Sequence, residues 1–230
     1  MQDLSFRDRA VFLPGPGVLV VADVHVGRDE ASGVEFPLGE RTDLRERLEG
    51  LLGHYHPDEV VVAGDVLHSF SRVSHDVEAS LRELAACCRD AGVRPVLVAG
   101  NHDTVLSEVW DGPVHDSYRP DDGTVVCHGH EEVDESAERY VVGHDHPAIE
   151  IEGQRRPCYL FGEGVYRGAD VLMLPAFNRL AAGVPVNEMR TADFQSPFVT
   201  DVDAFRPIVY DEYSQETLRF PPLGEFRRLL

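Results

Sequence analysis

The sequence predicts an α/β fold in which the strands of the first half form a mostly parallel sheet. In this half, three short apolar runs rich in β-branched residues alternate with two stretches of helical periodicity. In the second half, strand-like runs follow one another closely, separated by glycine, proline and acidic turns. We therefore expect a βαβαβ unit and a second, mixed or antiparallel sheet packed against it.

The expected elements follow in order along the chain. The first half has strands at 18–22, 60–63 and 96–99, and helices at about 39–52 and 75–91. The second half has strands at 124–127, 140–142, 148–151, 158–161 and 171–174. Residues from about 184 to 230 are rich in proline and polar side chains and are expected to form an irregular cap or tail. All 230 residues are expected to form a single domain, in line with the chain length.

Composition favours a protein without membrane segments. The apolar runs are short, whereas a membrane helix needs about 20 apolar residues. The N-terminus lacks a basic segment followed by an apolar stretch, so we expect a soluble, cytoplasmic protein with no membrane partner. The four cysteines lack CxxC spacing and are expected to be free thiols in a reducing compartment.

The charge balance is strongly acidic. Asp and Glu number 41 against 21 basic residues, all of them arginine, which gives a formal net charge of −20. Such a surface repels nucleic acid at low ionic strength, but in molar salt the Debye length falls to about 3 Å and the repulsion is screened. The composition resembles that of halophilic proteins from salt-loving cytoplasms, so net charge does not exclude a nucleic-acid substrate.

Five polar motifs follow the apolar strands. They are Asp23-Val24-His25, Gly64-Asp65, Gly100-Asn101-His102-Asp103, His128-Gly129-His130 and Gly143-His144-Asp145-His146. Residues that follow parallel strands meet at the carboxyl edge of a sheet, where α/β folds build their sites. Oxygen and nitrogen ligands without thiolates suit manganese, iron or zinc better than calcium or magnesium. The motifs therefore predict a transition-metal site.

These motifs resemble those of the calcineurin-like metallophosphoesterase superfamily, whose pattern is DxH, GD, GNH(D/E), a lone His and GHxH. The resemblance covers about residues 18–147, and five motifs in order make it specific. The sequence LPAFN at 174–178 is similar to the ICC-like branch, which includes phosphoesterases associated with DNA ligases. The resemblance implies a four-layer αββα sandwich of two mixed β-sheets flanked by helices, with the active site between the sheets.

The resemblance also implies a role for each motif residue. It assigns Asp65 as a bridging ligand of two divalent metal ions, manganese first, with iron or zinc as alternatives. It places one ion on Asp23, His25 and His146, and the other on Asn101, His128 and His144. The implied reaction is hydrolysis of a phosphate ester by metal-activated water. His102 would donate a proton to the leaving oxygen or stabilise the charge that develops on it, and Asn101 would also contact substrate.

The motif around Asp65 departs from the family pattern. Many relatives carry a carboxylate three positions after the bridging Asp, where it orients the catalytic His, and this chain has His68 there. Asp103 is a candidate for the orienting role because it adjoins His102. His68 is instead a candidate contact for substrate phosphate, as are Arg28 and Arg72, either of which could form a bidentate guanidinium pair.

The favoured function is metal-dependent hydrolysis of a phosphodiester rather than a monoester. The ICC-like branch includes nucleases and phosphodiesterases, and the sequence shows no cluster of basic residues that would bind a monoester. The substrate is expected to be nucleic acid or a small nucleotide. A catalytically idle metal-binding scaffold of the same fold is the alternative, and the filled ligand positions and His102 argue against it. A third hypothesis is a structural metal site with closed coordination, and the lack of cysteine ligands argues against it.

Overall fold

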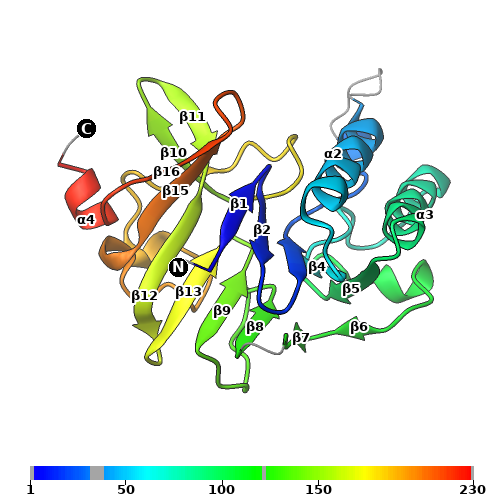
Figure 1. Cartoon of the computed structure of the whole chain (residues 1–230), viewed down its shortest axis with the longest axis horizontal. Coiled ribbons are helices and arrows are strands. Elements are labelled where there is room, and N and C mark those ends of the chain that lie inside the picture. The colour runs from blue at the N-terminus through cyan, green and yellow to red at the C-terminus, as the bar shows by residue number, and fades with distance from the viewer. Residues whose placement is uncertain (1–2, 32–38, 121–122, 229–230) are drawn as a thin grey trace.

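The computed structural model describes residues 3–31, 39–120 and 123–228 and arranges them in four layers (Figure 1). Two mixed sheets pack together, and α2 (Glu40–Tyr55) and α3 (His75–Asp90) cover the outer face of the first sheet. The predicted sandwich is thus confirmed. The outer layer over the second sheet, however, consists of irregular chain and short helices: η2 (Thr191–Asp193), η3 (Val202–Ala204) and α4 (Leu223–Phe226).

The first sheet contains the predicted βαβαβ unit. Its strands lie side by side in chain order: β1 (Ser5–Arg7), β2 (Ala10–Leu13), β3 (Val18–Val21), β4 (Glu59–Ala63), β5 (Arg94–Val98) and β6 (Val114–His115). As expected, β3, β4 and β5 are parallel. The hairpin of β1 and β2 was not predicted. Two short helices lie in the connections: α1 (Arg28–Ala31) and η1 (Leu106–Glu108).

The second sheet is mixed, and a small third sheet adjoins it. The larger one has the order β16 (Glu216–Arg219), β15 (Arg206–Asp211), β12 (Tyr159–Tyr166), β13 (Ala169–Met173), β9 (Arg139–Val142), β8 (Thr124–Cys127) and β7 (Ser117–Tyr118). Within it, β8, β9 and β13 are parallel. The third sheet has the order β11 (Gln154–Pro157), β10 (Pro147–Ile151) and β14 (Val184–Pro185).

The segment 184–230, expected to be an irregular cap or tail, contains strands of the second sheet. β15 pairs with β12 and β16 pairs with β15, both antiparallel. Two aromatic side chains of this segment, Phe198 and Phe205, are fully buried against the outer face of the sheet. Tertiary pairing, rather than local periodicity, therefore makes β15 and β16 regular.

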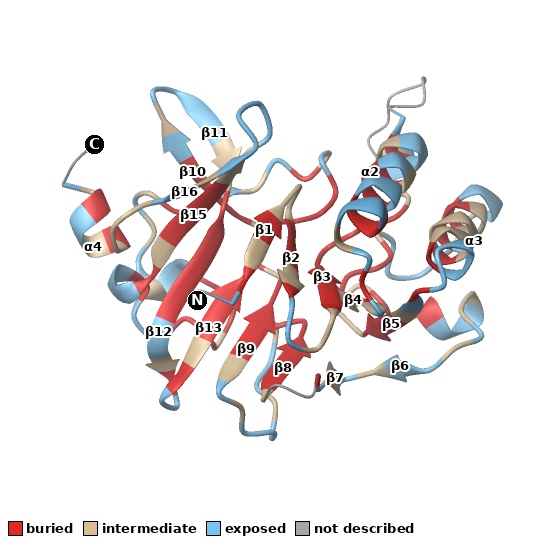
Figure 2. Ribbon diagram, in the orientation of Figure 1, coloured by how far each residue is buried: buried red, intermediate tan, exposed pale blue. Residues whose placement is uncertain are grey.

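The central strands of the two large sheets consist mostly of buried residues (Figure 2), and most of these are apolar. One cluster lies beneath α2 and α3 and includes Leu44 and Leu81, and a second lies between the sheets and includes Val61 and Leu172. Every residue of β3 is buried, as expected for a strand covered on both faces. The four cysteines are free, and three of them are buried. Among the described residues, no helix is both long and apolar enough to cross a lipid bilayer.

Removal of one hydroxyl tests how tightly the sheets are joined. Tyr159 is 1% exposed and its hydroxyl donates to the carbonyl of Ala10 at 2.7 Å, which links the second sheet to the first. In Tyr159→Phe the buried carbonyl loses its donor, so the free energy of unfolding should fall by about 1–3 kcal/mol. Urea unfolding measures this change. Tyr213→Phe is the control, because Tyr213 is 97% exposed, and an equal loss there would contradict the prediction.

Candidate metal centre

The first group of predicted ligands lies where the carboxyl ends of strands from both sheets meet. Asp23 and His25 follow β3, and His146 follows β9. Nε2 of His146 lies 3.2 Å from Nε2 of His25 and 3.2 Å from Oδ1 of Asp23. One ligand atom from each residue lies within 4.8 Å of the other two. The three side chains could therefore hold one ion.

The second group comes from two further strand ends and from the end of β9. Asn101 follows β5, His128 follows β8 and His144 follows β9. Nε2 of His128 lies 3.0 Å from Oδ1 of Asn101 and 3.2 Å from Nδ1 of His144. The structure thus brings these three predicted ligands together around the His128 ring.

Asp65, which follows β4, lies between the two groups. Its Oδ2 lies 3.8 Å from Nε2 of His25, and its Oδ1 lies 3.4 Å from Nε2 of His128. Burial raises the pKa of Asp65 to about 7, and the charge of Asp23 adds to the shift. A cation nearby would favour the ionised form instead. The position and electrostatics of Asp65 both suit a carboxylate shared by two ions.

The protonation of His128 tests whether the site fits a cation. Its Nδ1 lies 3.1 Å from the carbonyl oxygen of Ala63, which can only accept, so Nδ1 carries the proton. Nε2 of the neutral ring then presents a lone pair, yet it faces the oxygens of Asn101 and Asp65. Burial lowers the pKa of His128 and so disfavours a second proton. A cation between these acceptors would resolve the conflict, so the residues present fit a metal.

Burial also keeps His25 and His144 neutral. It lowers the pKa of His25 to about 3 and that of His144 to about 4. Burial acts in the same direction on His146, but the adjacent Asp23 carboxylate raises its pKa above the usual value. Asp23 itself is fully buried and accepts a hydrogen bond from the amide of His144 at 3.1 Å. Neutral imidazoles around a buried carboxylate are the form in which these groups bind metals.

Five of the predicted ligands have left-handed backbone conformations. Their φ values lie between 46° and 75°, in Asp23, His25, Asp65, His144 and His146. Such conformations cost about 1–3 kcal/mol each and persist only where the surroundings enforce them. At Asp23, His25 and Asp65, hydrogen bonds between the loops after β3 and β4 enforce them, from the amide of Asp23 to the carbonyl of Gly64 and from that of His25 to the carbonyl of Asp65. The ligand loops are therefore held in position by backbone pairing.

Glycine is required where the two sheet edges approach closely. A Cβ atom at Gly64 would lie 2.3 Å from Nδ1 of His128. A Cβ atom at Gly143 would lie 2.6 Å from Oδ2 of Asp23. Both distances are too short for real contacts, so a larger residue at either position would displace a predicted ligand.

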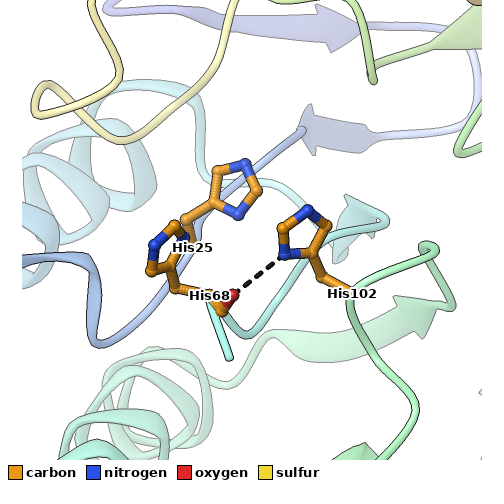
Figure 3. Close-up of side chains that lie close together, drawn as sticks. All are labelled: His25, His68 and His102. Carbon is orange, nitrogen blue, oxygen red and sulfur yellow. Dashed lines mark hydrogen bonds between the residues drawn. The ribbon is translucent and has the colours of Figure 1, made fainter. Parts of the chain in front are cut away.

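The predicted proton donor, His102, is oriented by a backbone carbonyl. Figure 3 shows its ring close to those of His25 and His68, with Nδ1 bonded to the carbonyl oxygen of His68 at 2.9 Å. The carbonyl can only accept, so Nδ1 carries a proton and Nε2 is the atom that exchanges one. Nε2 lies 3.8 Å from Oδ2 of Asp65, at the rim of the centre.

Asp103, expected to orient His102, makes different hydrogen bonds. Its carboxylate accepts from the amides of Val66, Leu67 and Gly100 at 3.1, 2.9 and 2.8 Å. Three amide donors occupy the oxygens, and the orienting bond of His102 goes to His68 instead. Asp103 thus ties the loop after β4 to the loop after β5, and its connection to His102 is indirect.

Two of the candidate phosphate contacts, His68 and Arg28, lie beside the centre. The His68 ring centroid lies 5.5 Å from that of His25 and 5.9 Å from that of His102. Burial, with a contribution from the charge of Arg28, lowers the pKa of His68. Nε of Arg28 donates to the carbonyl of Leu180 at 3.3 Å. The structure therefore places both side chains near the metal ligands, although residues 32–38 of the adjoining loop lie outside the described residues.

Sequence reasoning assigned no role to a buried pair that supports the loop of His25. Nδ2 of Asn178 donates to the carbonyl of Val24 at 2.9 Å and to the carboxylate of Glu40 at 2.6 Å. Glu40 also accepts from the amide of Gly27 at 2.8 Å. Burial raises the pKa of Glu40 to about 7. An asparagine within an apolar run, as in LPAFN, is the sequence signal that could have identified this support.

Solved structures of similar fold include several phosphoesterases. Nuclease MPE of Pseudomonas putida has 22% identity and a TM-score of 0.65, covering 93% of this chain and 92% of that chain. The E. coli phosphoesterase Yfce has 13% identity and a TM-score of 0.45, covering 89% and 98%. A dimetal phosphatase from Danio rerio has 11% identity and a TM-score of 0.39, covering 85% and 92%.

The sequence comparison identifies the family. No curated protein gives a significant match to the chain. Residues 17–173, which are more than half of the 230 residues, match the model of the calcineurin-like phosphoesterases. This segment includes all five polar motifs and runs from β3 to β13. The chain therefore belongs to the calcineurin-like phosphoesterase family.

Proposed function

We propose that this protein hydrolyses phosphodiesters with two divalent metal ions. The observation that carries the proposal is the convergence of two ligand groups on one shared carboxylate, that of Asp65. Asp23, His25 and His146 would hold one ion, and Asn101, His128 and His144 the other. The oxygen and imidazole ligands suit manganese, with iron or zinc as alternatives.

The chain's own residues would supply the proton and the alignment. When bound, the two ions lower the pKa of a water molecule and neutralise charge on the phosphoryl oxygens. His102 would donate a proton from Nε2 to the leaving oxygen, because Nδ1 is held by the His68 carbonyl. Asn101 and His68 would contact the phosphate from either side of His102.

A diester suits the charge of the site better than a monoester. A phosphomonoester dianion brings one more negative charge than a diester to a chain whose net charge is −20. Arg28 is a predicted guanidinium contact for phosphate. Its Nε already donates to the Leu180 carbonyl, so this donor does not help to balance a second negative charge. The nuclease among the similar structures is consistent with a diester, and a nucleic acid or nucleotide is the substrate class we favour.

Ester hydrolysis is the direct test. With manganese bound, the protein should hydrolyse bis-p-nitrophenyl phosphate faster than p-nitrophenyl phosphate, and chelator should stop the reaction. His102→Ala should lower kcat about 100- to 10,000-fold through loss of the proton donor, while bound metal stays the same. His54→Ala, on an exposed histidine at the end of α2, is the matched control. Two bound ions without turnover of either ester would favour the idle scaffold.

Metal binding should also stabilise the fold. At a free metal concentration about 100 times Kd, each filled site adds about 2.7 kcal/mol to the free energy of unfolding. Chelator should therefore lower the midpoint of thermal unfolding, measured by circular dichroism beside metal content. In Asp65→Asn both sites lose a ligand, so the shift should shrink, whereas Asp90→Asn at an exposed carboxylate should retain it. An undiminished shift in Asp65→Asn would contradict the shared-ligand assignment.

A further inference from the structure

Phe70 is a large apolar residue exposed beside the proposed proton donor. It is 52% exposed, although aromatic side chains usually gain stability from burial. Its ring centroid lies 3.8 Å from that of His102, with 31° between the ring planes. Its carbonyl accepts a hydrogen bond from the hydroxyl of Thr104, which fixes the backbone. One face of the ring is thus supported, and much of the rest remains open.

The position of this ring relates it to the leaving group. Nε2 of His102 is the atom that would give a proton to the leaving oxygen, because Nδ1 is bonded to His68. The rings of His102 and Phe70 are in contact, so the alcohol that carries this oxygen has to lie next to Phe70. A leaving group that receives its proton from Nε2 would therefore lie beside the exposed part of the Phe70 ring.

Two clefts beside the centre differ in charge. One, of about 430 Å³, adjoins His128 and His130 and is lined by five carboxylates: Asp116, Glu131, Glu132, Asp134 and Glu135. The other, of about 360 Å³, is lined by His68, Ser69 and Arg72 together with the carboxylate of Glu30. The structure pairs the guanidinium of Arg72 with none of the described carboxylates. A polyanionic substrate would extend along the second cleft, on the side of residues 68–72.

We propose that Phe70 stacks on a nucleobase of the leaving group, so that the substrate is a phosphodiester of a nucleoside. This inference rests on the proposed function and adds the residue that recognises the base and the side of the scissile bond on which that base lies. Every base can stack on an aromatic ring. Stacking does not depend on a positive charge, so a strongly acidic protein can also use it. Arg72 binds the next phosphate of the same strand. A base thus stacks on the exposed ring of Phe70, and the sugar-phosphate backbone of the same strand lies in the adjoining cleft.

The alternative is that Phe70 only holds the His102 ring in place, and this alternative predicts a different result. In that case Phe70→Leu slows the hydrolysis of every ester equally. Under stacking, the loss depends on whether the leaving alcohol carries a base. The substrates that separate the two are thymidylyl thymidine and its two analogues in which one or the other base is replaced by hydrogen.

The experiment compares kcat/KM for these three diesters with manganese-loaded protein, and the products show which nucleoside leaves. In the wild type, removal of the leaving-side base should lower kcat/KM about ten-fold. In Phe70→Leu, removal of the leaving-side base should no longer change kcat/KM. Phe70→Trp should restore the preference, and Tyr213→Leu, at a distant exposed aromatic residue, should keep it.

Three outcomes overturn the inference. They are a preference that persists in Phe70→Leu, an equal loss on all three diesters, and the absence of any base preference in the wild type. Turnover of bis-p-nitrophenyl phosphate reports on the proposed function separately. If no nucleoside diester is cleaved, fluorescence anisotropy in chelator compares a labelled pentathymidylate with its abasic counterpart. Equal binding of the two by the wild type would likewise overturn the inference.

Discussion

Burial of the carboxylates of Asp23 and Asp65 is the constraint on which the rest of this structure depends. An ionised carboxylate in a protein interior is unfavourable unless charges or donors surround it. Asp23 ends a strand of the first sheet, and its partners His144 and His146 follow a strand of the second. The two sheets therefore have to present their carboxyl edges to the same point. The apolar cluster between the sheets, which includes Val61 and Leu172, keeps those edges aligned. The centre can therefore assemble only where the core between the sheets is packed.

Much of the fold could be predicted because its central strands carry their own signal. Runs such as that of β3 are apolar throughout, and only a strand buried on both faces has that composition. The amphipathic pattern of α3 likewise identified a helix, whose observed range His75–Asp90 nearly equals the predicted one. The hairpin of β1 and β2 was missed because its strands have only three and four residues. The pair β15–β16 was missed because β15 depends on pairing with β12, which lies far along the chain. Local sequence does not encode such partners.

In the candidate site, too, some features could be predicted from the sequence and others could not. Order and spacing of the motifs identified which residues come together, since parallel strands deliver them to one edge. Hydrogen-bond partners could not be inferred in this way. Asp103 is adjacent to His102 in sequence, yet its carboxylate turns to three backbone amides, and a carbonyl three residues after Asp65 orients the ring instead. The departure at His68 thus changes the orienting group from a side chain to the backbone. Because any residue at that position offers a carbonyl, the side chain of His68 is free for another purpose.

The left-handed conformations of the ligand residues have a consequence for how this protein can change. Glycine adopts that conformation without the strain that other residues incur, so replacement of a strained ligand relieves the backbone while it removes a metal contact. Selection for the stability of the metal-free protein would therefore favour the loss of the centre, whereas the stabilisation that bound metal adds opposes that loss. Relatives that keep only a scaffolding role would be expected to arise by this route. An engineer who wants a more robust catalyst should leave these loops unchanged and modify the solvent-facing sides of α2 and α3.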